Sequence, residues 1–79
     1  MPRYFFHTHD GEHLIPDETG QELDGLEDAK ATAQQALLDM AKDKLAGGDQ
    51  CVFMVSVREN ADEVMRVALA MRVEYFTKA

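Results

Sequence analysis

A single long alanine-rich helical pattern, with strand patterns before and after it, limits the folds open to this chain more than any other feature. Apolar residues recur every three or four positions over residues 26–41 and form one face of a helix. Asp24 is the predicted N-cap, with Glu27 as a variant of the capping box. Gly47-Gly48 is predicted to end the helix. Because alanine side chains are small, this face can lie close against a sheet.

The residues before the helix predict a short hairpin. Residues 3–9 are dense in aromatic side chains, which favour strands, and Asp10-Gly11 is a strong tight-turn pair. Residues 12–15 can fold back as a second strand, which Pro16 ends because proline has no amide hydrogen for the ladder. A turn and then a brief extended stretch are predicted at residues 17–20 and 21–23.

The residues after the helix predict two longer strands. Residues 51–58 alternate between two sets of side chains, and residues 59–62 have the composition of a turn. Residues 64–76 also alternate with a period of two, which is typical of a strand. A helix is the alternative for this last segment, because Asn60 and Glu63 could form a capping box and the following residues are good helix formers. We favour the strand, since a helix here would have no coherent polar face.

These elements predict a single α+β domain over residues 1–79: a small antiparallel sheet of three to four strands, in the order β-β-α-β-β, with the helix packed on one face. The second sheet face would be too apolar for a solvated face and too small for a second core. Such a patch indicates a partner, and we expect a homodimer; the alternative is an ordinary mixed face. The predicted dimer or partner face, which the edge of the last strand could extend, comprises Val52, Met54, Arg66, Ala68, Ala70 and Arg72.

The net charge of −7 lies in the N-terminal third of the chain. Residues 1–28 contain eight acidic residues and one basic residue, whereas residues 29–79 contain seven of each. An acidic chain repels phosphate backbones, which argues against nucleic acid as a partner. We expect a cytoplasmic protein that does not enter a membrane. The single cysteine, Cys51, allows no internal disulfide, and no stretch resembles a signal peptide or approaches the ~20 apolar residues of a membrane span.

Three histidines and two carboxylates fall within seven residues at the predicted hairpin. Two of the histidines project from the same face of a strand, and the turn could bring the third beside them. Imidazole and carboxylate groups bind zinc, nickel or copper, so one hypothesis is a metal-binding domain that uses His7, His9 and His13. The spacing matches no established zinc motif, and a polar surface hairpin looks the same. No other cofactor is indicated.

The sequence contains no recognisable set of catalytic residues. Cys51 lies in an apolar strand, where a thiol usually serves packing. Ser56 and Thr8 have no identifiable oxyanion loop beside them. We therefore expect a noncatalytic protein that acts by binding.

RNA binding is a third hypothesis for the second sheet face. Sheets that carry aromatic and basic side chains bind single-stranded RNA, and this face would combine arginines with Phe5, with His7 as a further candidate. The net charge and the lack of lysine in the last two predicted strands argue against it. The arginines concerned are Arg58, Arg66 and Arg72.

The opening of the chain resembles a known family. Residues 1–7 read MPRYFFH, an Asp-Gly pair follows at positions 10–11, and residues 17–23 read DETGQEL. This pattern is similar to that of a family of short uncharacterised bacterial (alphaproteobacterial) proteins, a domain of unknown function, in which an alanine-rich helix and two strands follow. The resemblance is close over residues 1–46 and loose after them. It implies an order of elements and no activity.

Two segments depart from the family pattern. Many members have a tryptophan where the third strand begins, whereas this chain has Cys51-Val52-Phe53, and many end with a short strand and a proline-containing turn in place of residues 64–76. We interpret the shared motif positions as structural: the glycines permit positive φ, the aspartates hydrogen-bond to the backbone, and the histidine is a satisfied strand residue. These positions are His7, Asp10, Gly11, Asp17, Gly20 and Glu22.

Overall fold

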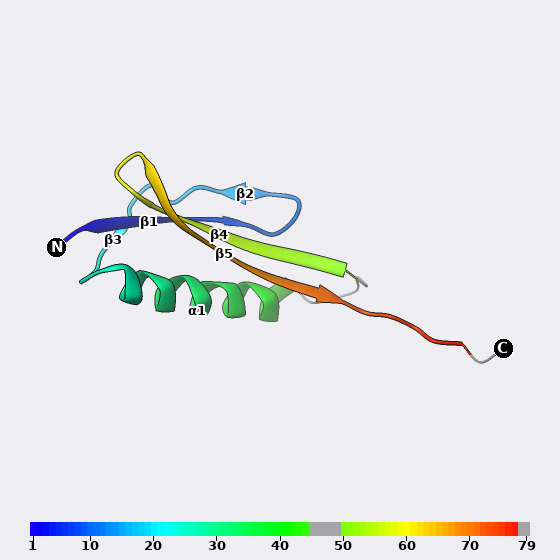
Figure 1. The fold of residues 1–79 in the computed structure, drawn as a ribbon. Helices are drawn as coiled ribbons and strands as arrows, with labels where there is room; N and C mark the ends of the chain where they lie inside the picture. The colour runs from blue at the N-terminus through cyan, green and yellow to red at the C-terminus, as the bar shows by residue number, and fades with distance from the viewer. Residues whose placement is uncertain (45–49, 78–79) are drawn as a thin grey trace.

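The structure is a computed structural model that describes residues 1–44 and 50–77. One antiparallel sheet carries the single helix of these residues across one of its faces (Figure 1). This confirms the predicted α+β class and the order of the main elements. The elements are β1 (Arg3–His9), β2 (Leu14–Ile15), β3 (Gln21–Glu22), α1 (Leu26–Lys44), β4 (Gln50–Glu59) and β5 (Asp62–Arg72).

The sheet has the order β2-β1-β4-β5, and β3 also pairs with β1. Since β4 occupies one edge of β1, both β2 and β3 lie along its other edge. The sheet therefore has five strands, where three to four were predicted, because the brief extended stretch before the helix forms a short ladder with β1. The opposite edge of the sheet is β5, which pairs with β4 alone among the described strands.

The first hairpin has a second strand of two residues, where four were predicted. The Asp10 carboxylate oxygen Oδ1 accepts hydrogen bonds from the backbone amides of Glu12 (3.0 Å) and His13 (2.8 Å), so these two residues belong to the loop. Gly11 has a φ of 97°, a left-handed conformation that glycine adopts without strain. β2 then ends before Pro16, as predicted.

The helix α1 begins slightly later than predicted. The carbonyl of Gly25 accepts the first helical hydrogen bond from the amide of Ala29 (3.1 Å), so Gly25, and not the predicted Asp24, is the N-cap. Glu27 forms an ion pair with the lysine three positions on (3.2 Å) instead of reaching back to the cap. The predicted helix stop at residues 47–48 lies outside the described residues. Within the described ranges, no helix combines the length and apolarity needed to span a membrane.

β5 is a strand, so the preference for a strand over a helix in this segment is confirmed. It follows β4 after a tight turn in which Asn60 has a φ of 58°. β5 ends at Arg72, four residues before the predicted end, because β4 begins directly opposite at Gln50. Residues 73–77 continue as an exposed tail outside the ladder.

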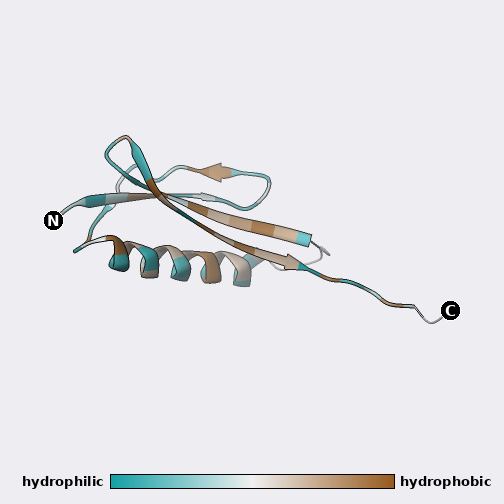
Figure 2. Cartoon of the chain, in the orientation of Figure 1, coloured by the Kyte–Doolittle hydropathy of each residue, from teal (hydrophilic) through white to brown (hydrophobic). Residues whose placement is uncertain are grey.

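The core lies between α1 and one face of β1, β4 and β5. The helix packs mainly over β4 and β5, and its interface alanines let it lie close to the strands, as predicted. Figure 2 shows that hydrophobic residues occupy much of β4 and β5. Complete burial of a valine or phenylalanine side chain contributes ~1.5–3 kcal/mol to stability. The buried residues are Tyr4, Phe6, Ala29, Ala33, Leu37, Ala41, Phe53, Val55 and Val57.

The molecule is long for its size. Its extents are 59 × 22 × 20 Å and its radius of gyration is 15.0 Å, whereas a compact chain of this length has a radius of gyration of about 12 Å. Figure 1 shows the reason: β4, β5 and the tail extend well past β1, and α1 covers one face of the sheet. The other face of the sheet is not covered by any described element.

Candidate functional site

The polar residues of the N-terminal motif hold one loop against β1. Asp17 Oδ2 accepts a hydrogen bond from the amide of Phe6 (3.1 Å), and the amide of Asp17 donates to Nδ1 of His7 (3.0 Å). Asp17 Oδ1 accepts hydrogen bonds from the amides of Thr19 and Gly20, both at 3.0 Å. The structural interpretation of these motif positions is therefore confirmed, and the contact with Phe6 adds a link that the sequence did not predict.

The ionisation of Asp17 reflects these contacts. Partial burial of the carboxyl group raises its pKa, but hydrogen bonds from the amides of Gly20, Phe6 and Thr19, with a smaller contribution from His7, outweigh burial and lower the pKa below its usual value. Asp17 is thus a carboxylate at neutral pH, and its charge is directed at backbone amides. It serves as a structural anchor for the loop before β3.

The three histidines of the predicted metal site make different contacts in the structure. Nδ1 of His7 accepts a hydrogen bond from the backbone amide of Asp17, and Nδ1 of His9 accepts one from the backbone amide of Gly11, both at 3.0 Å. The side chain of His13 is 74% exposed, and its Nδ1 lies 3.9 Å from a carboxylate oxygen of Asp10. Across residues 1–44 and 50–77, no three His, Cys, Asp or Glu side chains are arranged to hold a metal ion. Metal binding by these histidines stays a prediction.

The second face of the sheet, here called the open face, carries all six residues of the predicted partner face. In the ladder between β4 and β5, Val52 lies opposite Ala70 and Met54 lies opposite Ala68. Val52 is 47% exposed, although it is a large aliphatic residue in a central strand. The apolar part of the open face is therefore continuous across the two longest strands.

The charged part of the open face is paired internally. Arg66 donates hydrogen bonds to both carboxylate oxygens of Glu63, at 2.9 and 3.2 Å. These hydrogen bonds, together with the charges of Arg66 and Arg58, lower the pKa of Glu63, and Glu63 raises the pKa of Arg66. Arg72 pairs with Glu74 of the tail. An acidic group thus stands beside each arginine, which weakens the attraction for a phosphate backbone, and RNA binding stays a prediction.

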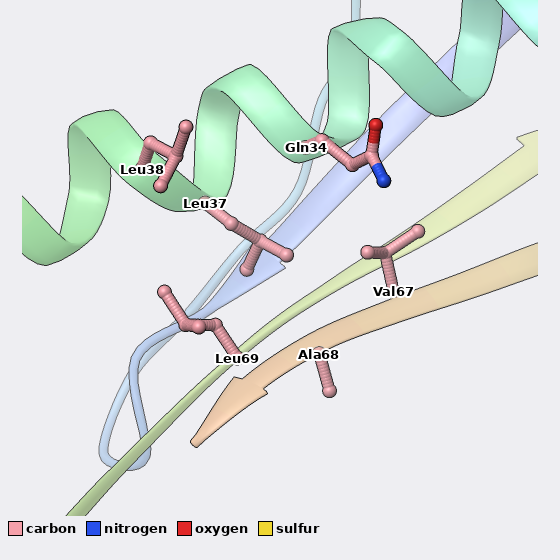
Figure 3. Close-up of a pocket in the computed structure, with 6 residues that line it drawn as sticks. All are labelled: Gln34, Leu37, Leu38, Val67, Ala68 and Leu69. Atoms are coloured by element: carbon pink, nitrogen blue, oxygen red, sulfur yellow. The ribbon is translucent and has the colours of Figure 1, made fainter. Parts of the chain in front are cut away.

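A groove between α1 and β5 is the feature that sequence reasoning missed. It has a volume of about 370 Å³, and it lies at the edge of the sheet where β5 has no outer partner among the described strands. Figure 3 shows aliphatic side chains approaching it from the helix above and the strand below. The signal in the sequence is Leu38, a large apolar residue that lies outside the predicted apolar face of the helix. In the structure its side chain is 53% exposed. The lining residues are Gln34, Leu37, Leu38, Val67, Ala68 and Leu69.

Comparison with known proteins identifies the family but no characterised relative. No curated protein and no solved structure gives a significant match to the chain. A family model described as a domain of unknown function (DUF6894) matches residues 3–70, from the start of β1 almost to the end of β5. The matched residues include the first hairpin, the helix, β4 and most of β5, and the expected membership of an uncharacterised family is confirmed. The chain belongs to the family of this domain of unknown function (DUF6894).

Proposed function

We propose that this protein is a noncatalytic interaction domain that works as a homodimer. The observation that carries the proposal is an excess of exposed surface. The chain exposes 5868 Å², whereas a compact monomer of its mass exposes about 4,800 Å². The difference of about 1,000 Å² exceeds the ~800 Å² that each partner buries in a standard interface.

The location of the excess surface supports binding by this part of the molecule. The open face, the outer edge of β5 and the tail all expose large apolar side chains, including Val52, Met71 and Phe76. Val52 lies on the open face, Met71 on the helix side of β5 and Phe76 in the tail, so apolar side chains are exposed on both faces of the β4–β5 part of the sheet. A second copy is the simplest partner, because two-fold dimers are the commonest oligomers.

The polar side chains of the motif support a binding role in another way. His7, His9, Asp10 and Asp17 all hydrogen-bond to backbone amides of the N-terminal loops. Side chains engaged in this way specify turns and strand ends, and the architecture that they support is a rigid sheet. The proposal includes a cytoplasmic location, because the lone Cys51 suits a reducing compartment.

Native mass spectrometry on untagged protein, purified without a nickel column, tests the proposal. We expect the mass of two chains and no added mass. A monomer at every concentration would overturn the homodimer. A species with one metal ion per subunit would instead support the histidine hypothesis. In that case, replacing His7, His9 and His13 with alanine should abolish the added mass.

A further inference from the structure

We propose that the second copy binds along the outer edge of β5, antiparallel to it. The two-fold axis would lie midway between Ala68 of one copy and Ala68 of the other, and this position is here called an axis through Ala68. The two sheets would then form one continuous sheet, with both helices on the same side. This inference rests on the proposed homodimer and specifies which surface forms it. Strand addition at an exposed edge gains main-chain hydrogen bonds and side-chain contacts together.

The two edges of the sheet differ in how they resist such pairing. On the β1 side, the edge consists of β2 and β3, which are two residues each, and Pro16 follows β2 directly. Short edge strands and proline block the addition of another strand. β5 is eleven residues long and contains neither proline nor lysine. The β5 edge therefore lacks the devices that protect the other edge.

Charge also directs a second copy to β5. The excess of acidic residues lies in residues 1–28, which form β1, the loops around β2 and β3, and the start of α1. Two copies that approached through this side would repel each other. β5 has two acidic and two basic residues and so has no net charge. Of the two edges, only that of β5 can meet its own copy without repulsion between like charges.

The pairing of β4 and β5 limits the register of the dimer. Val57 pairs with Met65, but the next β4 residue, Arg58, pairs with Glu63, so Val64 is an extra residue that bulges the strand. The regular part of β5 therefore begins at Met65. Residues directly opposite each other in antiparallel strands share a face of the sheet. A two-fold axis perpendicular to the sheet must for this reason pass through a residue, and not between two residues.

The arginines and the bulge select the position of the axis. An axis through Arg66 would oppose it to its own copy, and an axis through Leu69 would oppose Arg66 to Arg72. An axis at Val67 or at Ala70 would leave only five residues of the regular part of β5 paired, residues 65–69 or residues 68–72. An axis through Ala68 pairs residues 65–71 with themselves, entirely within the regular part of β5, and places each Arg66 opposite an alanine.

The groove is centred on the same residue. Its strand side is formed by Val67, Ala68 and Leu69, and Ala68 points away from the helix while its two neighbours face the groove side (Figure 3). With the axis at Ala68, Val67 of one copy lies opposite Leu69 of the other on the helix side. The two grooves would join into one apolar seam, with Leu38 at its border in each copy. The same patch on both subunits is what a two-fold interface requires.

Disulfide cross-linking tests the register with a matched pair of variants. In a Cys51→Ala background, Ala68→Cys places the two introduced cysteines directly opposite each other. Their Cα atoms would be about 4.5–5.5 Å apart. Ala70→Cys changes the same residue type on the same face of the same strand. Its two copies would lie about 13 Å apart, from four residues at 3.3 Å each, beyond the ~7 Å limit for a disulfide. Mild oxidation should link the first variant and leave the second unlinked.

Charge substitution provides a second test that does not depend on oxidation. Ala68→Glu would oppose two carboxylates across the axis and should raise the dimer dissociation constant about tenfold or more. Ala70→Glu adds the same net charge, but it would face the partner's Arg66 and should leave the dimer intact. Both alanines are exposed, so neither change disturbs the core. Circular dichroism of each variant checks the fold.

The outcomes distinguish failure of the proposed β5 interface from failure of the proposed homodimer. A wild-type monomer would overturn both proposals. The wild type could be a dimer while Ala68→Cys and Ala70→Cys link equally, or while Ala68→Glu and Ala70→Glu weaken association equally. Either result would overturn the proposal that the β5 edge forms the interface, and the homodimer would stand. Equal effects of this kind are those expected if the two open faces stack. Selective linking of Ala68→Cys, with selective dissociation of Ala68→Glu, supports the edge.

Discussion

Asp17 connects three parts of the N-terminal motif through one carboxylate and one amide. It ties the loop before β3 to β1 at Phe6 and, through its own amide, to the ring of His7. Nine hydrophobic residues are buried in the part of the chain that the structure describes, and such polar contacts specify loop positions that this core does not reach.

We predict that Asp17→Ala lowers the free energy of unfolding by about 1–3 kcal/mol at pH 7, because three backbone amides lose their acceptor. The pKa of Asp17 is lowered in the folded state, so its contribution is present above the unfolded pKa of ~3.9 and disappears as the pH falls through the folded pKa. Urea titrations at pH 7 and pH 3 should show a difference between wild type and variant that shrinks in acid. The exposed neighbour offers a control, Glu18→Ala, for which a comparable loss would contradict the anchor role.

Gly20 is the glycine whose replacement the structure opposes most clearly. It has a φ of 75°, and an added Cβ would lie 2.9 Å from a ring carbon of Phe5. We expect Gly20→Ala to cost at least ~1–2 kcal/mol of unfolding free energy from the backbone conformation alone. Gly25→Ser, at the N-cap with open space around it, should change stability by only a few tenths of a kcal/mol, in the stabilising direction. Thermal unfolding of both variants distinguishes them, and equal losses would contradict this account.

The local contacts of these aspartates can be predicted from the sequence, whereas the long-range contact cannot. The turns at Asp10 and Asp17 are predictable because aspartate hydrogen-bonds to amides two or three residues ahead. The bond from Phe6 to Asp17 spans eleven positions and depends on how β1 and the loop pack, which no local pattern encodes. The N-cap differs by one residue, since Asp24 and Gly25 are both acceptable caps and the direction of the incoming chain decides between them.

Among the elements, α1 and the two long strands follow from periodicity, because each has one face in the core, and β1 follows from its aromatic side chains. The ends of β5 do not follow, because the alternation of side chains continues to residue 76 while the ladder ends where β4 begins. The groove was missed for a related reason. It lies between a helix and a strand that are far apart in the sequence, and a pattern within one element cannot reveal it.

Adjacent leucines of α1 test the two sides of the helix. Leu37 is 4% exposed, and Leu37→Ala should cost about 2–5 kcal/mol of unfolding free energy. That is a large part of the total stability of a domain this small. Leu38→Ala should cost less than about 1 kcal/mol when measured at a concentration where the chain is monomeric, because its side chain is half exposed. It should, however, weaken the dimer, since Leu38 borders the proposed seam. An unchanged dissociation constant for Leu38→Ala would remove the groove from the interface.

On the scale of the whole molecule, shape and charge act against each other. The elongated sheet leaves apolar surface exposed, which favours association, while a charge of −7 on each copy opposes it. We therefore expect the dimer dissociation constant to fall as salt rises from about 0.05 M to about 0.5 M, because screening weakens the repulsion between the copies. Sedimentation equilibrium at several salt concentrations measures this. A constant that rises with salt would show that ion pairs, and not apolar contacts, hold the dimer together.

Small-angle X-ray scattering across a concentration series measures both the association and the arrangement of the two copies, because forward scattering reports mass and the angular dependence reports shape. We expect the mass to rise from 8.9 kDa to twice that value and the radius of gyration to rise well above 15.0 Å, as two long sheets join edge to edge. A mass that doubles with little change in the radius of gyration would indicate stacked faces instead of joined edges. A mass that stays at 8.9 kDa with a radius of gyration of 15.0 Å at every concentration would contradict the claim that this domain works as a homodimer.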